Sequence, residues 1–239
     1  MNTQVEQPRR GPSLILLHSI PMFAGVPDAQ LEQIAKVAFH RRVARQTTIV
    51  RAGDSTDSLY VLISGSAKVL NSDEEGREVI LTLLGPGEFF GEMGLIDGSP
   101  RSADVMATET CELLVITKAD FIRCLSENFD LCLNIMKSLV QRLREADRNI
   151  ESLALMDVYG RVAKLLIDFS EDERGQYVIK RRLTKQDIAK MIGASREMVS
   201  RVMKDLENRG YFRVEGGRII IREKSIPSAP GNQSTEGDK

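Results

Sequence analysis

The sequence predicts an α+β fold with a β-rich N-terminal half, one long helix and a smaller helical C-terminal domain. Three patterns predict it. Short apolar runs of β-type, interrupted by glycines, fill residues 44–116. Apolar residues at helical spacing then continue over residues 129–156. Two shorter amphipathic segments on either side of Gly193 have the arrangement of a helix-turn-helix.

The N-terminal half begins with a segment, residues 1–20, that we expect to be irregular because proline and glycine interrupt its short apolar patch. A helix is expected over Asp28–Phe39, where apolar residues share one face. The runs LYVLI, AKVL, EVILTLL and CELLVI then alternate with turn glycines. Residues 21–128 are therefore predicted to form a β-roll of jelly-roll type.

The long helix carries a heptad seam, the signature of a two-stranded coiled coil. Its apolar residues are spaced alternately by four and three: Cys132, Met136, Leu139, Leu143, Ala146, Ile150 and Leu153, of which Met136, Leu139, Leu143, Ile150 and Leu153 are the expected dimerisation residues. The alternative is a helix packed against its own domain. A homodimer is favoured because a helix-turn-helix protein reads two half-sites about one turn of DNA apart, which requires twofold symmetry.

Residues 181–207 carry the helix-turn-helix pattern. Gly193 supplies the tight turn, and Ser195 is a suitable N-cap for the second helix. The apolar positions recur at helical spacing in both segments: Leu183, Ile188, Met191 and Ile192 in the first, and Val199, Val202, Met203 and Leu206 in the second.

Four polar residues occupy the other face of the second helix near its start: Arg196, Glu197, Ser200 and Arg201. That end of a recognition helix meets base edges in the major groove. Arginine suits guanine O6 and N7, and glutamate suits cytosine N4. The segment therefore predicts sequence-specific binding to double-stranded DNA; a solvated, salt-bridged helix hairpin is the alternative.

Charge is unevenly distributed along a chain whose net charge is only −1. Residues 180–213 carry ten Lys and Arg against four Asp and Glu, whereas residues 54–130 carry five against fifteen. A basic block is the electrostatic footprint of phosphate binding. The DNA surface is therefore expected in the C-terminal half.

A second constellation lies in the predicted roll, within residues 90–103. Arg101 can clamp a phosphate with its guanidinium fork, and Ser102 adds a donor. Glu92 can accept from a ribose 2′-hydroxyl, and Gly91 lets the backbone approach a ligand closely. These residues suit a cyclic nucleotide. The alternative is a structural Glu92–Arg101 ion pair in a roll that binds nothing.

Both constellations resemble bacterial transcription regulators of the cAMP receptor protein/FNR (Crp/Fnr) type, over nearly the whole chain. The cAMP-receptor branch reads DNA through a Ser-Arg-Glu-x-x-x-Arg run, matched here by Ser195, Arg196, Glu197 and Arg201. The FNR branch uses Glu-x-x-Ser-Arg, which Glu197, Ser200 and Arg201 also satisfy. Arg196 favours the first branch, whose half-site resembles TGTGA.

The resemblance also implies an organisation and partners. It implies a cyclic-nucleotide-binding roll over 21–128, a dimerisation helix over 129–156 and a winged helix-turn-helix over 157–224, and we expect the polar tail 225–239 to be disordered. Gly91, Glu92, Arg101 and Ser102 match the family's phosphate-binding cassette, and Thr184 matches a phosphate-contacting position. RNA polymerase is the implied protein partner.

The chain departs from the family at the base-binding position of the long helix. The cAMP-receptor branch has a Thr-Ser pair there, whereas this chain has Ala146 and Asp147. Alanine offers no side-chain hydrogen bond, but Asp147 can accept from an exocyclic amine. The resemblance implies cAMP as the effector, Asp147 makes cyclic di-GMP the alternative, and a ligand-independent regulator with a purely structural roll is also left open. A nucleotide-sensing module that does not read DNA is the remaining rival class.

Other chemistries are not indicated. Cys111, Cys124 and Cys132 lack the clustered spacing of an iron–sulfur or zinc site, and His18 and His40 are too few for a typical zinc centre. No catalytic triad or carboxylate pair stands out, so we predict neither an enzyme nor a metal cofactor. With no apolar run of the roughly 18 residues that a membrane helix needs, and with scattered cysteines, we expect a cytoplasmic protein without membrane contact.

Overall fold

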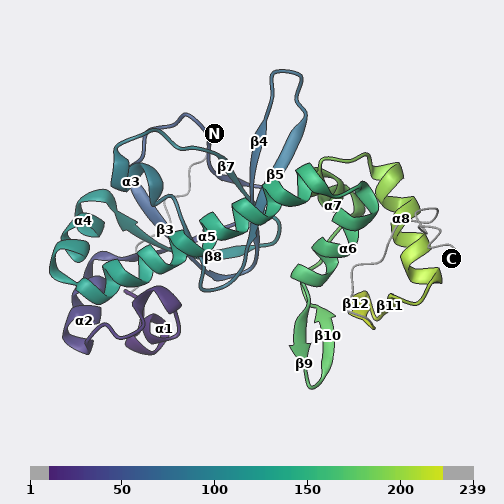
Figure 1. The fold of residues 1–239 in the computed structure, drawn as a ribbon. Helices are drawn as coiled ribbons and strands as arrows, with labels where there is room; N and C mark the ends of the chain where they lie inside the picture. The colour runs from purple at the N-terminus through teal and green to yellow at the C-terminus, as the bar shows by residue number, and fades with distance from the viewer. Residues whose placement is uncertain (1–10, 223–239) are drawn as a thin grey trace, which may run out of the picture. The chain divides into compact units, whose positions relative to one another are not determined.

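The computed structural model describes residues 11–222 and divides the chain into two compact units (Figure 1). The N-terminal unit is Met1–Leu143 and the C-terminal unit is Arg144–Lys239. The boundary falls inside the long helix α5, Phe129–Leu155. The predicted tail 225–239 and half of the predicted irregular segment lie outside the described residues.

The core of the N-terminal unit is a roll of two four-stranded antiparallel sheets within residues 39–117. One sheet has the order β1 (Phe39–Val43), β8 (Cys111–Thr117), β3 (Ser58–Ser64), β6 (Phe89–Phe90). The other has the order β2 (Thr48–Val50), β7 (Asp104–Ala107), β4 (Ala67–Ser72), β5 (Glu78–Leu84). The predicted β-roll is confirmed, although it begins at Phe39 rather than at residue 44.

Strand β3 shows why its sequence is apolar without interruption. Successive side chains of a strand point to opposite faces. Tyr60 and Leu62 pack between the two sheets, whereas Leu59 and Val61 pack on the outer face against helices. Because both faces are covered, the strand reads as a continuous apolar run rather than as an alternation.

The helices of the N-terminal unit cover that outer face (Figure 1). They are α1 (Leu14–His18), α2 (Asp28–Val37), α3 (Met93–Asp97), α4 (Lys118–Glu127) and the start of α5, with a 3-10 turn at Pro21–Phe23. Helix α1 lies inside the segment that was expected to be irregular. It forms because the Ser13 hydroxyl caps it, accepting from the Leu16 amide at 3.3 Å, and because Leu17 is fully buried.

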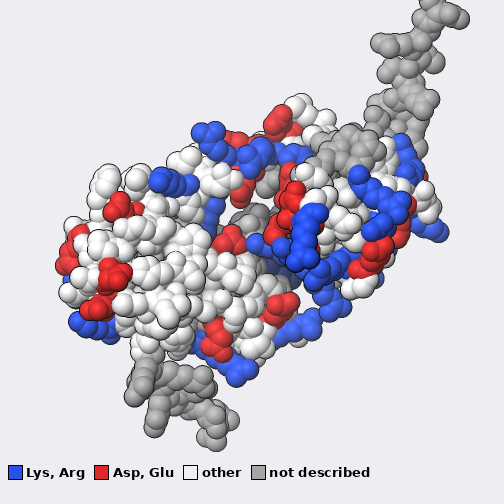
Figure 2. Space-filling model, turned by 90° about the horizontal axis from the view of Figure 1, so that it is seen from below, with Lys and Arg blue, Asp and Glu red and all other residues white. Residues whose placement is uncertain are grey.

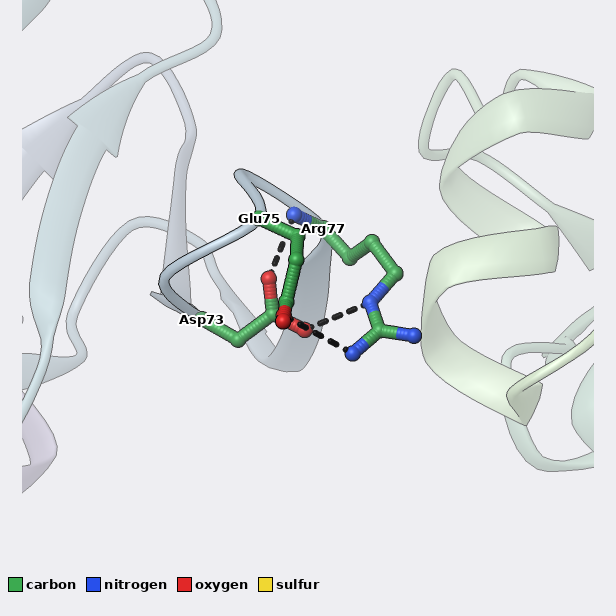
Figure 3. Close-up of polar contacts among 3 residues, drawn as sticks. All are labelled: Asp73, Glu75 and Arg77. Atoms are coloured by element: carbon green, nitrogen blue, oxygen red, sulfur yellow. Dashed lines mark hydrogen bonds and ion pairs between the residues drawn. The ribbon is translucent and has the colours of Figure 1, made fainter.

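The β4–β5 hairpin protrudes at the top of Figure 1, and charged side chains stabilise its turn by hydrogen bonds and ion pairs (Figure 3). Asp73 accepts from the Arg77 amide at 2.8 Å and from Arg77 Nε at 2.6 Å. Glu75 accepts from Arg77 Nη2 at 3.0 Å. The backbone and side-chain hydrogen bonds from Arg77 lower the pKa of Asp73 below its ordinary value. The tip is therefore a closed, acidic turn.

Helix α5 packs on the roll with one face and leaves a second apolar face exposed. Ile135 is buried against the roll, and Leu139 is partly buried there. The exposed stripe comprises Met136 (49% exposed), Val140 (50%), Leu143 (62%), Ile150 (65%) and Leu153 (51%). The register of the stripe therefore differs from the predicted seam, since Val140 joins it while Leu139 faces its own roll.

The C-terminal unit packs three helices on a small antiparallel sheet. Its elements are α6 (Val158–Asp168), β9 (Glu171–Glu173), β10 (Gln176–Ile179), α7 (Lys185–Ile192), α8 (Arg196–Asn208), β11 (Phe212–Glu215) and β12 (Arg218–Ile221). The strands have the order β11-β12-β10-β9. The β11–β12 hairpin follows α8 as the wing of a winged helix-turn-helix, so the predicted fold class is confirmed.

Candidate functional site

Arg101 is the centre of the candidate ligand site in the roll. Its side chain is only 5% exposed. Nη1 donates to the Gly91 carbonyl at 2.7 Å, and Nη2 donates to the Ser58 carbonyl at 2.8 Å and to Asp57 Oδ1 at 3.3 Å. Within residues 11–222, the Nε–H and the second Nη1–H have no partner. These hydrogen bonds fix the guanidinium, and its two remaining N–H groups are available to a ligand.

Position 91 requires a glycine because of its backbone conformation and because the Arg101 side chain lies against it. Its φ of +85° favours glycine. A Cβ atom built at this position would overlap the Arg101 guanidinium. The structure therefore brings Gly91 and Arg101 together.

Glu92, 2% exposed, is paired with a residue that the sequence did not single out. Its Oε1 accepts from Arg142 Nη1 of α5 at 2.9 Å. Arg142 also donates to the Phe89 carbonyl and lies over the Phe89 ring at 4.8 Å. Within residues 11–222 the alternative Glu92–Arg101 ion pair does not form, because Glu92 pairs with Arg142 and Arg101 with Asp57.

The remaining predicted ligand residues are peripheral to these contacts. Ser102 is exposed, and its hydroxyl lies 3.7 Å from Met93 Sδ. Ala146 and Asp147 are both exposed on α5, in the C-terminal unit. Ala146 comes one turn after Arg142 on the same helix. Asp147 is in phase with Leu143 and Ile150, on the exposed stripe.

The helix-turn-helix is fixed by two N-caps and a left-handed turn. Thr184 and Asp187 form a capping box at the start of α7, and the Ser195 hydroxyl accepts from the Met198 amide at 3.2 Å at the start of α8. Gly193 ends α7 with φ +62° and ψ +48°. Arg161 of α6 donates to the carbonyl of Ile192 at 2.7 Å, which anchors the turn. Thr184 and Ser195 thus serve local structure in addition to any contact with phosphate.

Helix α8 has the two faces that its sequence predicts. The buried face consists of Val199, Val202, Met203 and Leu206. Arg196, Glu197 and Arg201 are exposed on the opposite face, and Ser200 is half-buried. The structure therefore places the expected base-reading residues on one accessible surface at the N-terminal part of the helix.

The surface charge agrees with this placement. Figure 2 shows Lys and Arg side chains gathered over the C-terminal unit, on the right of the view, with acidic side chains among them. Within the described part of the chain, no helix is long and apolar enough to cross a membrane. Residues 11–222 also contain no cluster of three His, Cys, Asp or Glu side chains that could hold a metal ion.

Comparison with known proteins agrees with both halves of the chain. Residues 40–128 match the cyclic nucleotide-binding domain and residues 160–225 match the Crp-like helix-turn-helix domain. The chain is 35% identical over 210 residues to the cAMP-activated global transcriptional regulator Vfr of Pseudomonas aeruginosa, covering 84% of this chain and 98% of Vfr. It is 36% identical over 180 residues to the cAMP-activated regulator CRP of Haemophilus influenzae, covering 74% of this chain and 80% of that protein.

Solved structures of bacterial regulators are also similar to this chain. The c-di-GMP responsive global regulator CLP of Xanthomonas campestris superposes with a TM-score of 0.68 at 30% identity, covering 82% of this chain and 99% of CLP. FixK2 of Bradyrhizobium japonicum, at 18% identity and a TM-score of 0.71, covers 79% of this chain and 94% of its own and shares the fold.

A cyclic nucleotide-binding domain joined to a Crp-like helix-turn-helix defines a class of DNA-binding transcription regulators and not of enzymes. This chain belongs to the Crp/Fnr family of bacterial transcription regulators.

Proposed function

We propose that this regulator is a homodimer whose affinity for DNA is switched by a cyclic nucleotide bound in the roll. Gly91, Glu92, Arg101 and Ser102 hold the phosphate and ribose. Binding shifts an existing equilibrium toward the dimer state that fits DNA. The protein then acts in the bacterial cytoplasm, with RNA polymerase as its protein partner.

The observation that carries this proposal is the state of Arg101. A buried guanidinium needs a counter-charge, yet two of its three partners are neutral carbonyls, and the third, Asp57, has a side chain that is 75% exposed. A phosphate supplies a further negative charge and meets donors that have no partner within residues 11–222. The preformed site supports binding of one phosphate close to Gly91.

The DNA-binding half of the proposal uses the exposed face of α8. Arg196 and Arg201 pair with guanine, and Glu197 with cytosine, in a TGTGA-like half-site; the exposure of all three side chains supports this. Ser200 joins them on that face, and the N-cap residues Ser195 of α8 and Thr184 of α7 donate to phosphate. The exposed stripe of α5 supports the dimer that a palindromic site requires.

The effector is cAMP in the first version of the proposal, and two relatives whose names describe cAMP activation support it. Asp147 supports cyclic di-GMP as the second version, because a carboxylate accepts from both N1–H and the N2 amine of guanine. The relative CLP, which is c-di-GMP responsive, is 30% identical. In either version, Ala146 makes no side-chain hydrogen bond to the base.

Calorimetric titration of cAMP, and separately of cyclic di-GMP, into nucleotide-free protein tests the proposal. We expect heat for one ligand that Arg101→Gln abolishes, while the thermal melt verifies that the variant is folded. Ser102→Ala, whose hydroxyl touches only a methionine sulfur within the described residues, should weaken binding without any loss of stability. Absence of heat for both ligands, together with unchanged DNA affinity, would leave a ligand-independent regulator.

A further inference from the structure

Four residues join α6 to the C-terminal end of the recognition helix α8: Tyr159, Asp205, Arg209 and Tyr211, here called the α8 clamp. The Tyr159 hydroxyl donates to Asp205 Oδ2 at 2.7 Å. Arg209 Nη1 donates to the same hydroxyl at 2.8 Å and lies 3.7 Å from Asp205 Oδ2. The Arg209 guanidinium stacks over the rings of Tyr159 and Tyr211, at 5.8 and 5.2 Å from their centroids.

Asp205 lies four residues after Arg201 on the same helix, within reach of the Arg201 side chain. Residues four apart on a helix are neighbours, and an arginine and an aspartate at this spacing can pair. Arg201 is exposed, and its guanidinium contacts the Met198 sulfur at 3.9 Å. A free Asp205 carboxylate would therefore compete with DNA for Arg201.

The clamp removes this competitor. Tyr159 and Arg209 occupy one carboxylate oxygen of Asp205 and direct it toward α6 and the end of α8. Arg209 also places a positive charge at the helix C-terminus, where it is favourable. We propose that Tyr159 and Arg209 are positioning residues for DNA reading, because they hold Asp205 away from Arg201 and leave that guanidinium available to a base.

The state of Tyr159 agrees with this role. Tyr159 is 6% exposed, and its burial, with the hydrogen bond to Asp205, raises its pKa to about 12. The phenol therefore remains a proton donor throughout the pH range in which the protein reads DNA. A phenylalanine at this position would keep the ring contacts and lose only the hydroxyl.

The inference rests on the proposed base-reading role of Arg201, and the experiment separates the two. A duplex is first selected from a randomised pool by the full-length wild-type protein, with cAMP, with cyclic di-GMP and without ligand. Affinity for the selected duplex and for a random duplex of equal length is then measured by fluorescence anisotropy at one salt concentration. The ratio of the two affinities measures how well the protein discriminates between sequences. A general loss of positive charge would lower both affinities together and leave this ratio nearly unchanged.

We expect Tyr159→Phe to lower this ratio about tenfold, the scale of one good arginine–guanine pair, with affinity for random DNA within about twofold of wild type. Arg209→Gln removes the ion pair between Arg209 and Asp205 and should also lower the affinity ratio. Tyr159→Phe combined with Asp205→Asn should restore the ratio, because asparagine carries no charge to capture Arg201. Tyr211→Phe, which removes a hydroxyl 3.5 Å from Arg209 Nη2 but none from Asp205, is the matched control and should change nothing.

An unchanged ratio in Tyr159→Phe, or a double variant as poor as Tyr159→Phe alone, would overturn the inference. Arg201→Ala reports on the underlying function. If it leaves the ratio unchanged, Arg201 does not read a base, and both the proposed contact and the role of the clamp are wrong. If Arg201→Ala lowers the ratio and Tyr159→Phe does not, only the clamp is wrong.

Discussion

Glu92 and Arg142 form a charge pair in which one partner is almost fully buried. Breaking such a pair from one side leaves a buried charge without compensation, which costs about 3–5 kcal/mol when both partners are buried. Arg142 keeps 31% of its side chain in solvent, so the cost here should be smaller.

Arg142→Met should destabilise the N-terminal unit by about 2–3 kcal/mol in urea unfolding, because Glu92 loses its cation. Adding Glu92→Gln to this variant should recover most of the loss, since no buried charge then remains. A double variant no more stable than Arg142→Met would show that Arg142 acts through its packing on Phe89 instead.

The raised pKa values of two buried cysteine thiols predict their reactivity toward alkylation. Burial raises the pKa of the Cys111 and Cys124 thiols, so less thiolate is present at neutral pH than in a free cysteine. Neither should be alkylated by iodoacetamide in the native protein at pH 7.5, and both should react in urea, as followed by mass spectrometry. Rapid native labelling of Cys124 would contradict the burial on which this rests.

The sequence indicated one side of the candidate ligand site but not the other. Gly91, Glu92 and Arg101 lie within one short segment, so their residue types and spacing single them out as candidates. Arg142 lies 50 residues after Glu92, and nothing local distinguishes it from the other arginines of the long helix. Its role depends on how α5 packs against the roll, which only the tertiary structure defines.

At the scale of elements, the start of α8 combines a structural and a functional role in one residue. Ser195 caps the helix, and we also propose it as a donor to phosphate. Substitutions that keep the cap but change the charge can separate the two roles, because aspartate caps a helix as well as serine does.

Ser195→Ala should therefore cost about 1 kcal/mol of stability and weaken DNA binding, whereas Ser195→Asp should keep stability and weaken DNA binding more strongly through repulsion of phosphate. Thermal melts and anisotropy measure the two effects. Tight DNA binding by Ser195→Asp would exclude Ser195 from the phosphate contact.

Helix α5 shows what an apolar pattern can and cannot predict. Its bounds, Phe129–Leu155, agree with the predicted 129–156 within one residue. The predicted seam runs through Leu139, but Leu139 and Val140 are both apolar and either continues a heptad from Met136. Leu139 packs against the roll and Val140 is exposed, so we propose Val140 in place of Leu139 in the dimer seam.

At the scale of the whole molecule, the proposed dimer follows from this exposed stripe. Leu143→Asp should yield a monomer by light scattering, because it places a charge in the seam beside Met136, Val140 and Ile150. Arg144→Asp, one position along and therefore off the stripe, is the matched control and should remain dimeric. Dimers in both variants would remove α5 as the interface.

The exposed stripe also contains a carboxylate. Asp147 is in phase with Leu143 and Ile150, so the twofold symmetry of a dimer would place two like charges near each other. Asp147→Asn should therefore lower the dimer dissociation constant by removing their repulsion, measured by sedimentation at low protein concentration. Glu145→Gln, two residues earlier, removes the same charge from the opposite side of the helix and should have little effect. Equal changes in both variants would place Asp147 outside the seam.

The division between the two compact units has a practical consequence for anyone who wishes to separate them. Because the boundary lies between Leu143 and Arg144, within α5, a fragment ended there would break one continuous helix into residues 129–143 and 144–155. Isolated helices shorter than about 12–15 residues are marginal in water. Fragments ended after Leu155, where the helix terminates before the cap of α6 at Asp157, retain the whole helix and are the ones to express, crystallise or digest.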